Sequence, residues 1–143
     1  MTAAGRRRIA RVFVDTSAFF ALADQDDNHY REAQAIQQRL ITNRSAWFTS
    51  NFVVAETHAL FLARLGVRQA LEFLDRLERS SATLVRINAA DEARARAILR
   101  QYAAKDFSFT DAASFAVIVR LGLDSTFSFD RHFEQYGFVM LAP

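Results

Sequence analysis

The chain of 143 residues has no cysteine, one proline and four glycines. Without cysteine there is no disulfide framework, no Cys-ligated zinc, no iron–sulfur cluster and no thiol nucleophile, which fits a reducing compartment. The glycines, at positions 5, 66, 122 and 137, cannot form the GxGxxG or GxxxxGKS loops that cradle phosphates, so we expect no nucleotide cofactor. The sequence also lacks a GxSxG motif, which disfavours a Ser-His-Asp hydrolase.

Long apolar stretches are missing as well. The cluster Arg6–Arg8 precedes the apolar segment Ile9–Val14, as in a signal peptide, but Asp15 then interrupts the segment. The apolar core of a signal peptide needs about 7–15 residues and a small-residue cleavage site, and neither is present. No stretch reaches the roughly 18 uncharged apolar residues of a membrane span. We therefore expect a cytoplasmic protein that has no contact with a membrane.

The sequence is rich in hydrophobic residues. Hydrophobic residues make up 51% of the chain, and 14 residues are phenylalanine. A chain of this length buries roughly 68–70% of its unfolded surface on folding, so we expect a single domain over residues 1–143. The low content of glycine and proline excludes a collagen-like or linker-rich chain.

Apolar, β-branched runs alternate along the chain with segments of helical period. Strands are predicted over residues 9–14, 46–49, 83–87, 125–129 and 138–141, and helices over 16–23, 29–41, 52–65, 67–80, 91–103 and 111–121. Because the strands are mostly continuous apolar runs, they predict an α/β fold whose sheet is covered on both faces. Open sheets of this kind place their sites at the carboxyl ends of strands.

Acidic residues occur where such a site would form. Asp15 directly follows the predicted strand 9–14, and Asp130 directly follows 125–129. Asp111 is the predicted first residue of its helix, with Thr110 as the N-cap. Each of these acids also has a structural alternative, because a carboxylate caps a helix or a turn and interacts favourably with the helix dipole.

Glu56 lies inside a helix that is apolar nearly all the way round, which predicts deep burial. Its neighbours three and four positions away are all apolar, so its side chain shares their face. A buried ionised carboxylate costs several kcal/mol unless it is paired or bound to a metal. A buried ion pair with Arg64 or a core hydrogen bond is the structural alternative.

These four carboxylates are expected to converge at one edge of the sheet. There they would repel one another strongly unless protons or divalent cations lie between them. Oxygen ligands without cysteine or histidine suit Mg²⁺ or Mn²⁺. Such a cation polarises a phosphoryl oxygen and activates water, so the acidic set predicts hydrolysis of phosphodiester bonds.

The segments around the acids form an ordered pattern. They are VFVDTSAFFAL around Asp15, TSNFVVAETHAL around Glu56, DFSFTDAASFAV around Asp111 and STFSFDRHFEQYGF around Asp130. From about Val12 to Phe138 the chain resembles the PIN-domain nucleases, and among them the small VapC-type ribonuclease toxins. The resemblance implies a three-layer α/β/α sandwich with a mostly parallel central sheet. It also implies a metal-dependent endoribonuclease that is the toxin of a toxin–antitoxin pair and is neutralised by a cognate antitoxin.

The resemblance also assigns roles to the four acids. Asp15 and Asp111 would be the primary ligands of Mg²⁺ or Mn²⁺. Glu56 and Asp130 would complete the set, either by binding a second ion or by orienting a metal-bound water. The alternative function is a catalytically inactive PIN-fold scaffold that binds RNA or protein, although a degenerate site would be expected to have lost at least one acid.

Neighbouring residues receive supporting roles from the same resemblance. Thr16 and Ser128 match hydroxyl positions, where each would hydrogen-bond a ligand carboxylate, a water or a phosphate, and a helix-start role for Thr16 is an equal alternative. Arg131 and His132 follow the last acid and are placed to contact substrate, Arg131 through a phosphate, with plain surface exposure as the alternative. Residues 1–8 form an Arg-rich tail that is either solvated or in contact with RNA phosphate.

The remaining expectations concern partners and charge. A homodimer is expected by resemblance, and the helix face Leu71–Leu77 is a candidate for the dimer contact or for an antitoxin groove. The net charge is only +2, from 18 basic and 16 acidic side chains. If cations neutralise the four site acids, 12 acidic side chains remain against 18 basic ones, a balance of +6 that suits binding of an RNA polyanion.

Overall fold

The structure is a computed structural model that describes residues 8–143. The predicted Arg-rich tail over residues 1–8 lies, except for Arg8, outside the described residues. Arg8 is exposed and its guanidinium lies 3.3 Å from the carboxylate of Asp124. Within the described part of the chain, no helix is long and apolar enough to cross a membrane.

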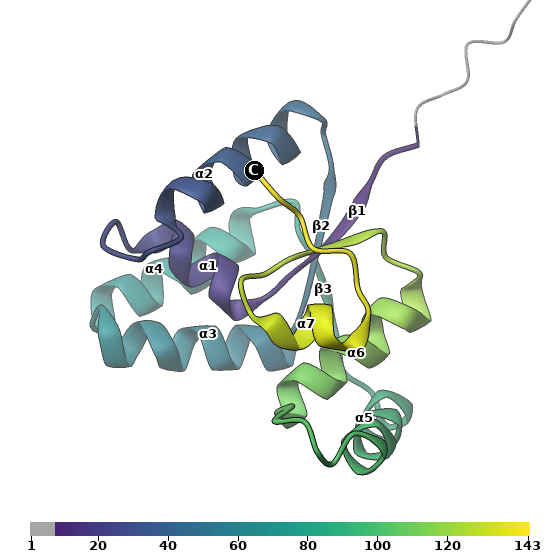
Figure 1. Ribbon diagram of the computed structural model, residues 1–143. Coiled ribbons are helices and arrows are strands. Elements are labelled where there is room, and N and C mark those ends of the chain that lie inside the picture. Colours follow the sequence, from purple (N-terminus) through teal and green to yellow (C-terminus); the bar gives the residue numbers. More distant parts are fainter. Residues whose placement is uncertain (1–7) are drawn as a thin grey trace, which may run out of the picture.

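A four-stranded sheet forms the centre of the fold (Figure 1). Its strands are β1 (Arg11–Val14), β2 (Ala46–Ser50), β3 (Thr83–Val85) and β4 (Ser125–Phe127), in the order β3-β2-β1-β4. Every neighbouring pair is parallel, with Phe13 opposite Phe48 of β2 and Val14 opposite Phe127 of β4. The predicted parallel sheet is therefore confirmed.

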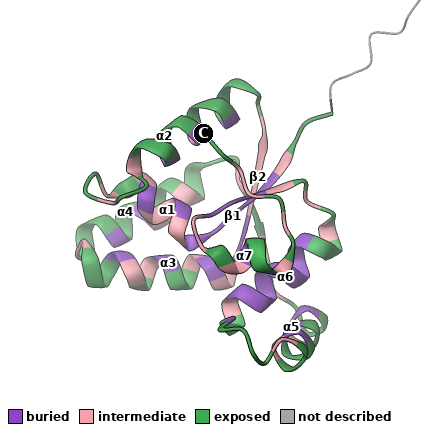
Figure 2. Cartoon of the chain, in the orientation of Figure 1, coloured by how far each residue is buried: buried purple, intermediate pink, exposed green. Residues whose placement is uncertain are grey.

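Helices connect the strands and cover the sheet. They are α1 (Thr16–Ala23), α2 (Tyr30–Thr42), α3 (Asn51–Arg64), α4 (Val67–Arg79), α5 (Ala89–Gln101), α6 (Phe109–Leu121) and α7 (Arg131–Tyr136). Since successive side chains of a strand point to opposite faces, β1 contributes to two cores. Phe13 packs with side chains of α3, α5, α6 and α7, whereas Val12 and Val14 pack with α1 and α2. Figure 2 shows the buried residues along these inward faces, and the α/β/α prediction is confirmed.

The C-terminal segment differs from the prediction in two ways. Residues 131–136 form the helix α7, for which the sequence shows no helical period. Its signals are the N-cap Asp130 and the left-handed C-cap Gly137, with φ of 114°, and they enclose only six residues, too few to show a helical period. The predicted strand over 138–141 is wrong, because only Met140 makes a parallel bridge, to Thr126.

The strand order places a switch point beside β1. After β1 the chain passes to β2 and β3 on one side, and it then crosses back to β4 on the other side. Ligand sites of open α/β sheets lie at such points, outside the carboxyl ends of the strands. Asp15 follows β1 and residues 128–130 follow β4, so the fold brings these predicted site residues to the switch point.

Arg11 connects the amino end of the sheet to the end of α6. Its guanidinium donates hydrogen bonds to the carbonyl oxygens of Leu121 and Gly122, both at 2.9 Å. These carbonyls lie at the helix C-terminus, where they have no partner inside the helix and carry the negative end of the dipole. Arg11 thus has a structural role at the edge opposite the predicted site.

Candidate active site

Asp15 lies at the carboxyl end of β1 and caps α1. It is only 4% exposed, and its Oδ2 accepts hydrogen bonds from the hydroxyls of Ser17 and Ser128, each at 3.0 Å. Burial raises the pKa of Asp15 to about 6, although the hydrogen bonds from Ser128, the Thr16 amide and Ser17 oppose the shift, and the charge of Asp111 adds to it. Asp15 does cap α1, because its Oδ2 also accepts a hydrogen bond of 3.4 Å from the backbone N–H of Ser17. This role does not exclude metal binding, since a nearby cation would stabilise the ionised form of Asp15.

The two predicted hydroxyl residues have different surroundings. The Ser128 hydroxyl donates to Asp15 and accepts a hydrogen bond of 3.0 Å from the backbone N–H of Asp130, so it links both acids. Thr16 is the first residue of α1, and its buried hydroxyl oxygen accepts a hydrogen bond of 3.0 Å from Thr57 of α3. Thr16 therefore lies at the helix start, and its contact with a ligand carboxylate, a water or a phosphate stays a prediction.

Asp111 reaches the same edge from α6. The predicted N-cap Thr110 is wrong, because the helix begins at Phe109 and Ser108 caps it. Ser108 and Asp111 form a capping box: the Ser108 hydroxyl accepts a hydrogen bond from the Asp111 amide, and Asp111 Oδ2 accepts one from the Ser108 amide, each at 3.0 Å. Two otherwise unpaired N–H groups are satisfied in this way, which Thr110 cannot match from inside the first turn.

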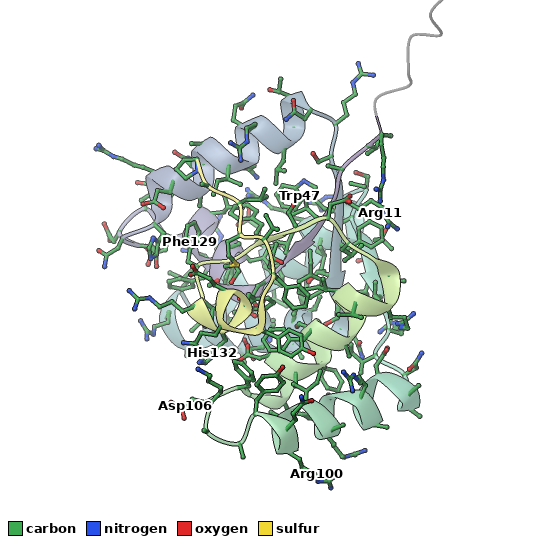
Figure 3. All side chains as sticks on the ribbon, turned by 45° about the vertical axis from the view of Figure 1, so that its right-hand side comes forward. Arg11, Trp47, Arg100, Asp106, Phe129 and His132 are labelled. Atoms are coloured by element: carbon green, nitrogen blue, oxygen red, sulfur yellow. The ribbon has the colours of Figure 1, made fainter. Side chains whose placement is uncertain are left out.

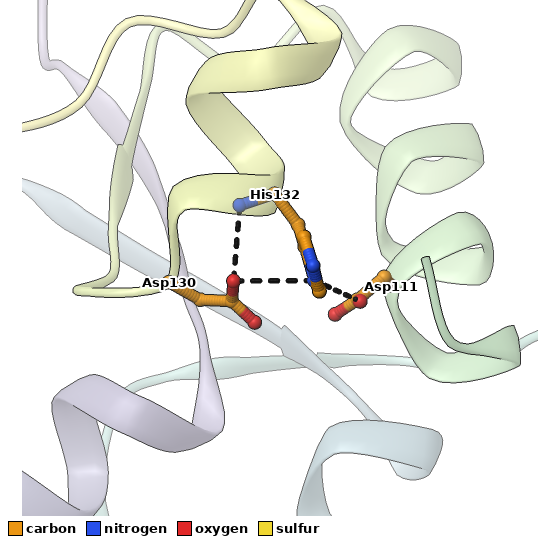
Figure 4. A group of neighbouring side chains, drawn as sticks. All are labelled: Asp111, Asp130 and His132. Atoms are coloured by element: carbon orange, nitrogen blue, oxygen red, sulfur yellow. Dashed lines mark hydrogen bonds and ion pairs between the residues drawn. The ribbon is translucent and has the colours of Figure 1, made fainter. Parts of the chain in front are cut away.

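Asp130 and His132 complete the group (Figure 4). Asp130 caps α7, and its Oδ1 accepts a hydrogen bond of 3.0 Å from the backbone N–H of His132. The ring of His132 turns back toward both acids, with Nδ1 at 2.8 Å from Asp111 Oδ2 and 3.2 Å from Asp130 Oδ1. Each of these three residues offers one ligand atom, and the three atoms lie within 4.8 Å of one another, a spacing at which they could hold one metal ion.

His132 makes contacts that its sequence neighbourhood did not predict. Its ring contacts two of the predicted metal ligands, and its contact with substrate stays a prediction. The signal in the sequence is Asp130 as a helix N-cap. An N-cap side chain accepts a hydrogen bond from the second helical residue, which here is His132, so His132 must lie close to the Asp130 carboxylate.

Glu56 is exposed, so the prediction of deep burial is wrong. The buried face of α3 consists of Val53, Thr57 and Phe61, and Glu56 points away from this line although it is adjacent to Thr57 in sequence. It makes no side-chain hydrogen bond or ion pair within residues 8–143, including the one considered with Arg64. An exposed carboxylate incurs no cost of burial, so burial gives no reason to expect a metal ion at Glu56. Its role stays a prediction from the resemblance alone.

The flanking charged residues are at the surface. Arg131, the first residue of α7, is exposed, so its contact with a substrate phosphate stays a prediction. Asp106, in the loop between α5 and α6, and Arg100 near the end of α5 point away from the body of the molecule in Figure 3. His132 is labelled in the same view, closer to the centre of the fold.

Comparison with known proteins gives the family. The PIN domain family model matches residues 12–139. The 23S rRNA-specific endonuclease VapC20 of Mycobacterium tuberculosis is 32% identical over 139 residues, which cover 92% of this chain and 98% of that protein.

Solved structures support the same relationship. The crystal structure of M. tuberculosis VapC20, a sarcin–ricin loop cleaving toxin, matches with a TM-score of 0.84 at 32% identity and covers 92% of this chain and 99% of the other. DNA-bound VapBC of Salmonella typhimurium and a toxin–antitoxin complex from Klebsiella pneumoniae each match with a TM-score of 0.64 at 17% identity. They cover 92% and 91% of this chain and 96% of theirs, and they show the fold alone. The chain belongs to the PIN domain family.

Proposed function

We propose that the protein is a metal-dependent endoribonuclease that hydrolyses RNA phosphodiester bonds as the toxin of a toxin–antitoxin pair. One observation carries the proposal: Asp111 and Asp130 lie together at the switch point of the sheet, and Asp15, at the end of the adjacent strand, is close enough for the charge of Asp111 to act on it. The chain is similar over most of its length to an rRNA endonuclease, and this similarity supports RNA hydrolysis as the reaction of the acidic site.

The donor atoms of the site fit Mg²⁺ or Mn²⁺. Carboxylate oxygens are the ligands that both ions prefer, and Asp111 and Asp130 present theirs close together. Asp15 lies near enough to Asp111 for their charges to interact. When bound, the metal would polarise a phosphoryl oxygen and make water a stronger nucleophile at neutral pH.

The chain itself supplies position and charge. Asp15, Asp111 and Asp130 would hold the metal, and each is fixed in place because it also caps a helix or belongs to a capping box. Ser128 holds Asp15 in one orientation through its hydroxyl. The exposed carboxylate of Glu56, in the second turn of α3, is free to orient the attacking water or to hold a second ion.

The proposed substrate class is RNA, and the proposed place of cleavage is the cytoplasm. The similarity to VapC20 makes 23S rRNA the first substrate to test. Once cations neutralise the site acids, the surplus of basic side chains favours a polyanion, and Arg131 begins the helix that follows the last acid.

The proposed protein partners are a cognate antitoxin and a second copy of the chain. The toxin–antitoxin complex among the solved structures supports the first. Two surfaces are available. One is a groove of about 820 Å³ between α1, α2 and α4, whose wall combines apolar side chains such as Leu22 and Trp47 with charged ones such as Glu72 and Arg76. The other consists of the exposed apolar side chains Val67 and Leu71 of α4. Of the predicted face Leu71–Leu77, only the Leu71 end is exposed, because Leu74 and Leu77 pack against Phe73 and its neighbours.

Cleavage of RNA by the purified full-length chain tests the function. With Mg²⁺ or Mn²⁺, the wild type should cleave 23S rRNA or total RNA, and Asp15→Asn combined with Asp111→Asn should abolish cleavage and growth inhibition. Asp106→Asn is the matched control, since it removes an exposed acid from the loop before α6. A double variant with full activity contradicts the proposal, and an inert wild type that still binds RNA or protein supports the scaffold instead.

A further inference from the structure

The imidazole ring of His132 occupies the space between two carboxylates of the acidic site. Its Nδ1 lies 2.8 Å from Asp111 Oδ2 and 3.2 Å from Asp130 Oδ1. Both acids already receive backbone hydrogen bonds that fix them, from the amides of Ser108 and His132. The ring is therefore not needed to orient either carboxylate.

The spacing of the three atoms suits a shared metal ion. Ligands that lie about 2.1 Å from an octahedral ion and at right angles to one another are separated by about 3 Å. Both distances from His132 Nδ1 are close to that value. Hydrogen bonds to the two carboxylates would have similar lengths, so a spectroscopic test must distinguish coordination from hydrogen bonding.

The position of the ring is built into the fold. The side chain of His132 is 26% exposed, so an ion could reach it from solvent. Its ring packs edge-on against Phe107, with ring centres 5.5 Å apart and planes at 77°. Phe107 is itself buried in the core beside Phe115, and this contact holds the imidazole against the acids.

We propose that His132 is a ligand of the metal through Nδ1, and that the centre consequently binds Mn²⁺ more tightly than Mg²⁺. The inference rests on the proposed function, since it concerns the same metal. Mg²⁺ takes oxygen ligands almost exclusively, whereas transition-metal ions also accept an imidazole nitrogen. A site of carboxylates plus one histidine therefore discriminates between the two ions in a way that a site of carboxylates alone does not.

Pulsed EPR of Mn²⁺ bound to the full-length chain tests the nitrogen ligand directly. The wild-type spectrum should show the hyperfine coupling of one directly bound imidazole ¹⁴N, and His132→Ala should lose it. The backbone N–H of residue 132, which donates to Asp130, is kept in this variant, so the acids stay in place. His29→Ala is the control, because His29 lies in the loop before α2 and stacks on Phe129 outside the cluster.

Calorimetry of the same proteins measures the ion preference. His132→Ala should bind Mn²⁺ about tenfold more weakly or worse, with a smaller loss for Mg²⁺, so that the preference for Mn²⁺ falls. His132→Asn, which places an amide oxygen near the same position, should keep binding of Mg²⁺ but show no imidazole coupling.

Two results would overturn the inference: bound Mn²⁺ without ¹⁴N coupling in the wild type, or the same coupling and ion preference in His132→Ala. The proposed function fails separately. If the wild type shows the coupling but cleaves no RNA, the nitrogen ligand stands and the nuclease does not. If RNA cleavage needs Asp15 and Asp111 while no coupling is found, the nuclease stands and the nitrogen ligand does not.

Discussion

The Ser128 hydroxyl donates a hydrogen bond of 3.0 Å to Oδ2 of Asp15, and this contact joins the ends of two adjacent parallel strands. The two residues are separated by 112 intervening positions, and the strand pairing of Val14 with Phe127 brings them together. The bond is directed at a buried carboxylate whose pKa is raised by burial to about 6, and it lowers that pKa. Ser128 thus favours the ionised form of Asp15, which is the form that binds a cation.

Removal of this hydroxyl should shift the pH dependence of cleavage. In Ser128→Ala, Asp15 loses a hydrogen bond to its charged form, so its pKa should rise further, by about one unit. At a fixed, subsaturating Mn²⁺ concentration, the acid limb of the kcat/KM profile should move to higher pH by a similar amount. Ser125→Ala, at the start of the same strand, should leave the profile unchanged. An acid limb that stays in place in Ser128→Ala contradicts the role given to the bond.

Asp15 should also make the metal-free protein less stable as the pH rises. Its pKa is about 6 in the folded state against 3.8 as the ordinary value, so the folded state binds the proton more tightly. The resulting stability is fully present below about pH 3.8 and is lost as the pH rises through about 6, a change of about 3 kcal/mol.

Thermal unfolding in EDTA between pH 4 and pH 7.5 measures this effect. Asp15→Asn keeps a good helix cap but cannot ionise, so its stability should exceed that of the wild type at pH 7.5 and match it more closely at pH 4. Saturating Mn²⁺ should stabilise the wild type at pH 7.5 and have little effect on the variant. Parallel curves for both proteins in EDTA would show that the buried carboxylate is not the cause.

Much of this arrangement could be predicted from the sequence, because strand ends are local signals. The pattern of apolar runs predicts that Asp15 directly follows a strand, which is confirmed, whereas β4 ends at Phe127, earlier than predicted, and Asp130 follows it after a short connection. Parallel strands bring such ends to one edge. The order β3-β2-β1-β4 could not be predicted, since it depends on which strands pair across long separations in sequence. Apolar neighbours alone also could not reveal the exposure of Glu56, because α3 buries only a narrow line of residues and leaves the apolar side chain of Leu62 45% exposed.

The ion pair between Asp91 and Arg120 should stabilise the fold without affecting the chemistry. Arg120 donates from Nε and Nη2 to the two carboxylate oxygens of Asp91, at 2.8 and 2.9 Å, and thereby joins α5 to α6. Burial raises the pKa of Asp91, but the hydrogen bonds from Arg120 and the Asn88 amide and the charge of Arg120 outweigh it, and the net pKa is lowered. This stabilisation is therefore present above about pH 3.8 and is lost as the pH falls below that value.

Arg120→Met tests this role. It leaves the carboxylate of Asp91, which is 3% exposed, without its partner, and should reduce the free energy of unfolding by about 2 kcal/mol at pH 7. The Arg120 side chain is 39% exposed, so the loss should be smaller than for a fully buried pair. Chemical denaturation measures the change, with Arg100→Met on the exposed surface of α5 as the control. RNA cleavage per folded molecule should stay at the wild-type level, and a selective loss of cleavage would contradict a purely structural role.

Arg131 should contribute to RNA binding through a phosphate. It is exposed and is the first residue of α7, directly after Asp130, and it does not belong to the acidic cluster. Each phosphate that a basic side chain neutralises adds to the salt dependence of binding, because counterions are released. In Arg131→Gln, KM for RNA should rise while kcat changes little, and the slope of log(kcat/KM) against log[salt] should become less steep by about one.

Arg39→Gln is a suitable control, since the Arg39 guanidinium hydrogen-bonds the carbonyl oxygen of Ala142 near the C-terminus. If kcat falls and the salt slope is unchanged, Arg131 acts on the chemical step and the phosphate contact is wrong.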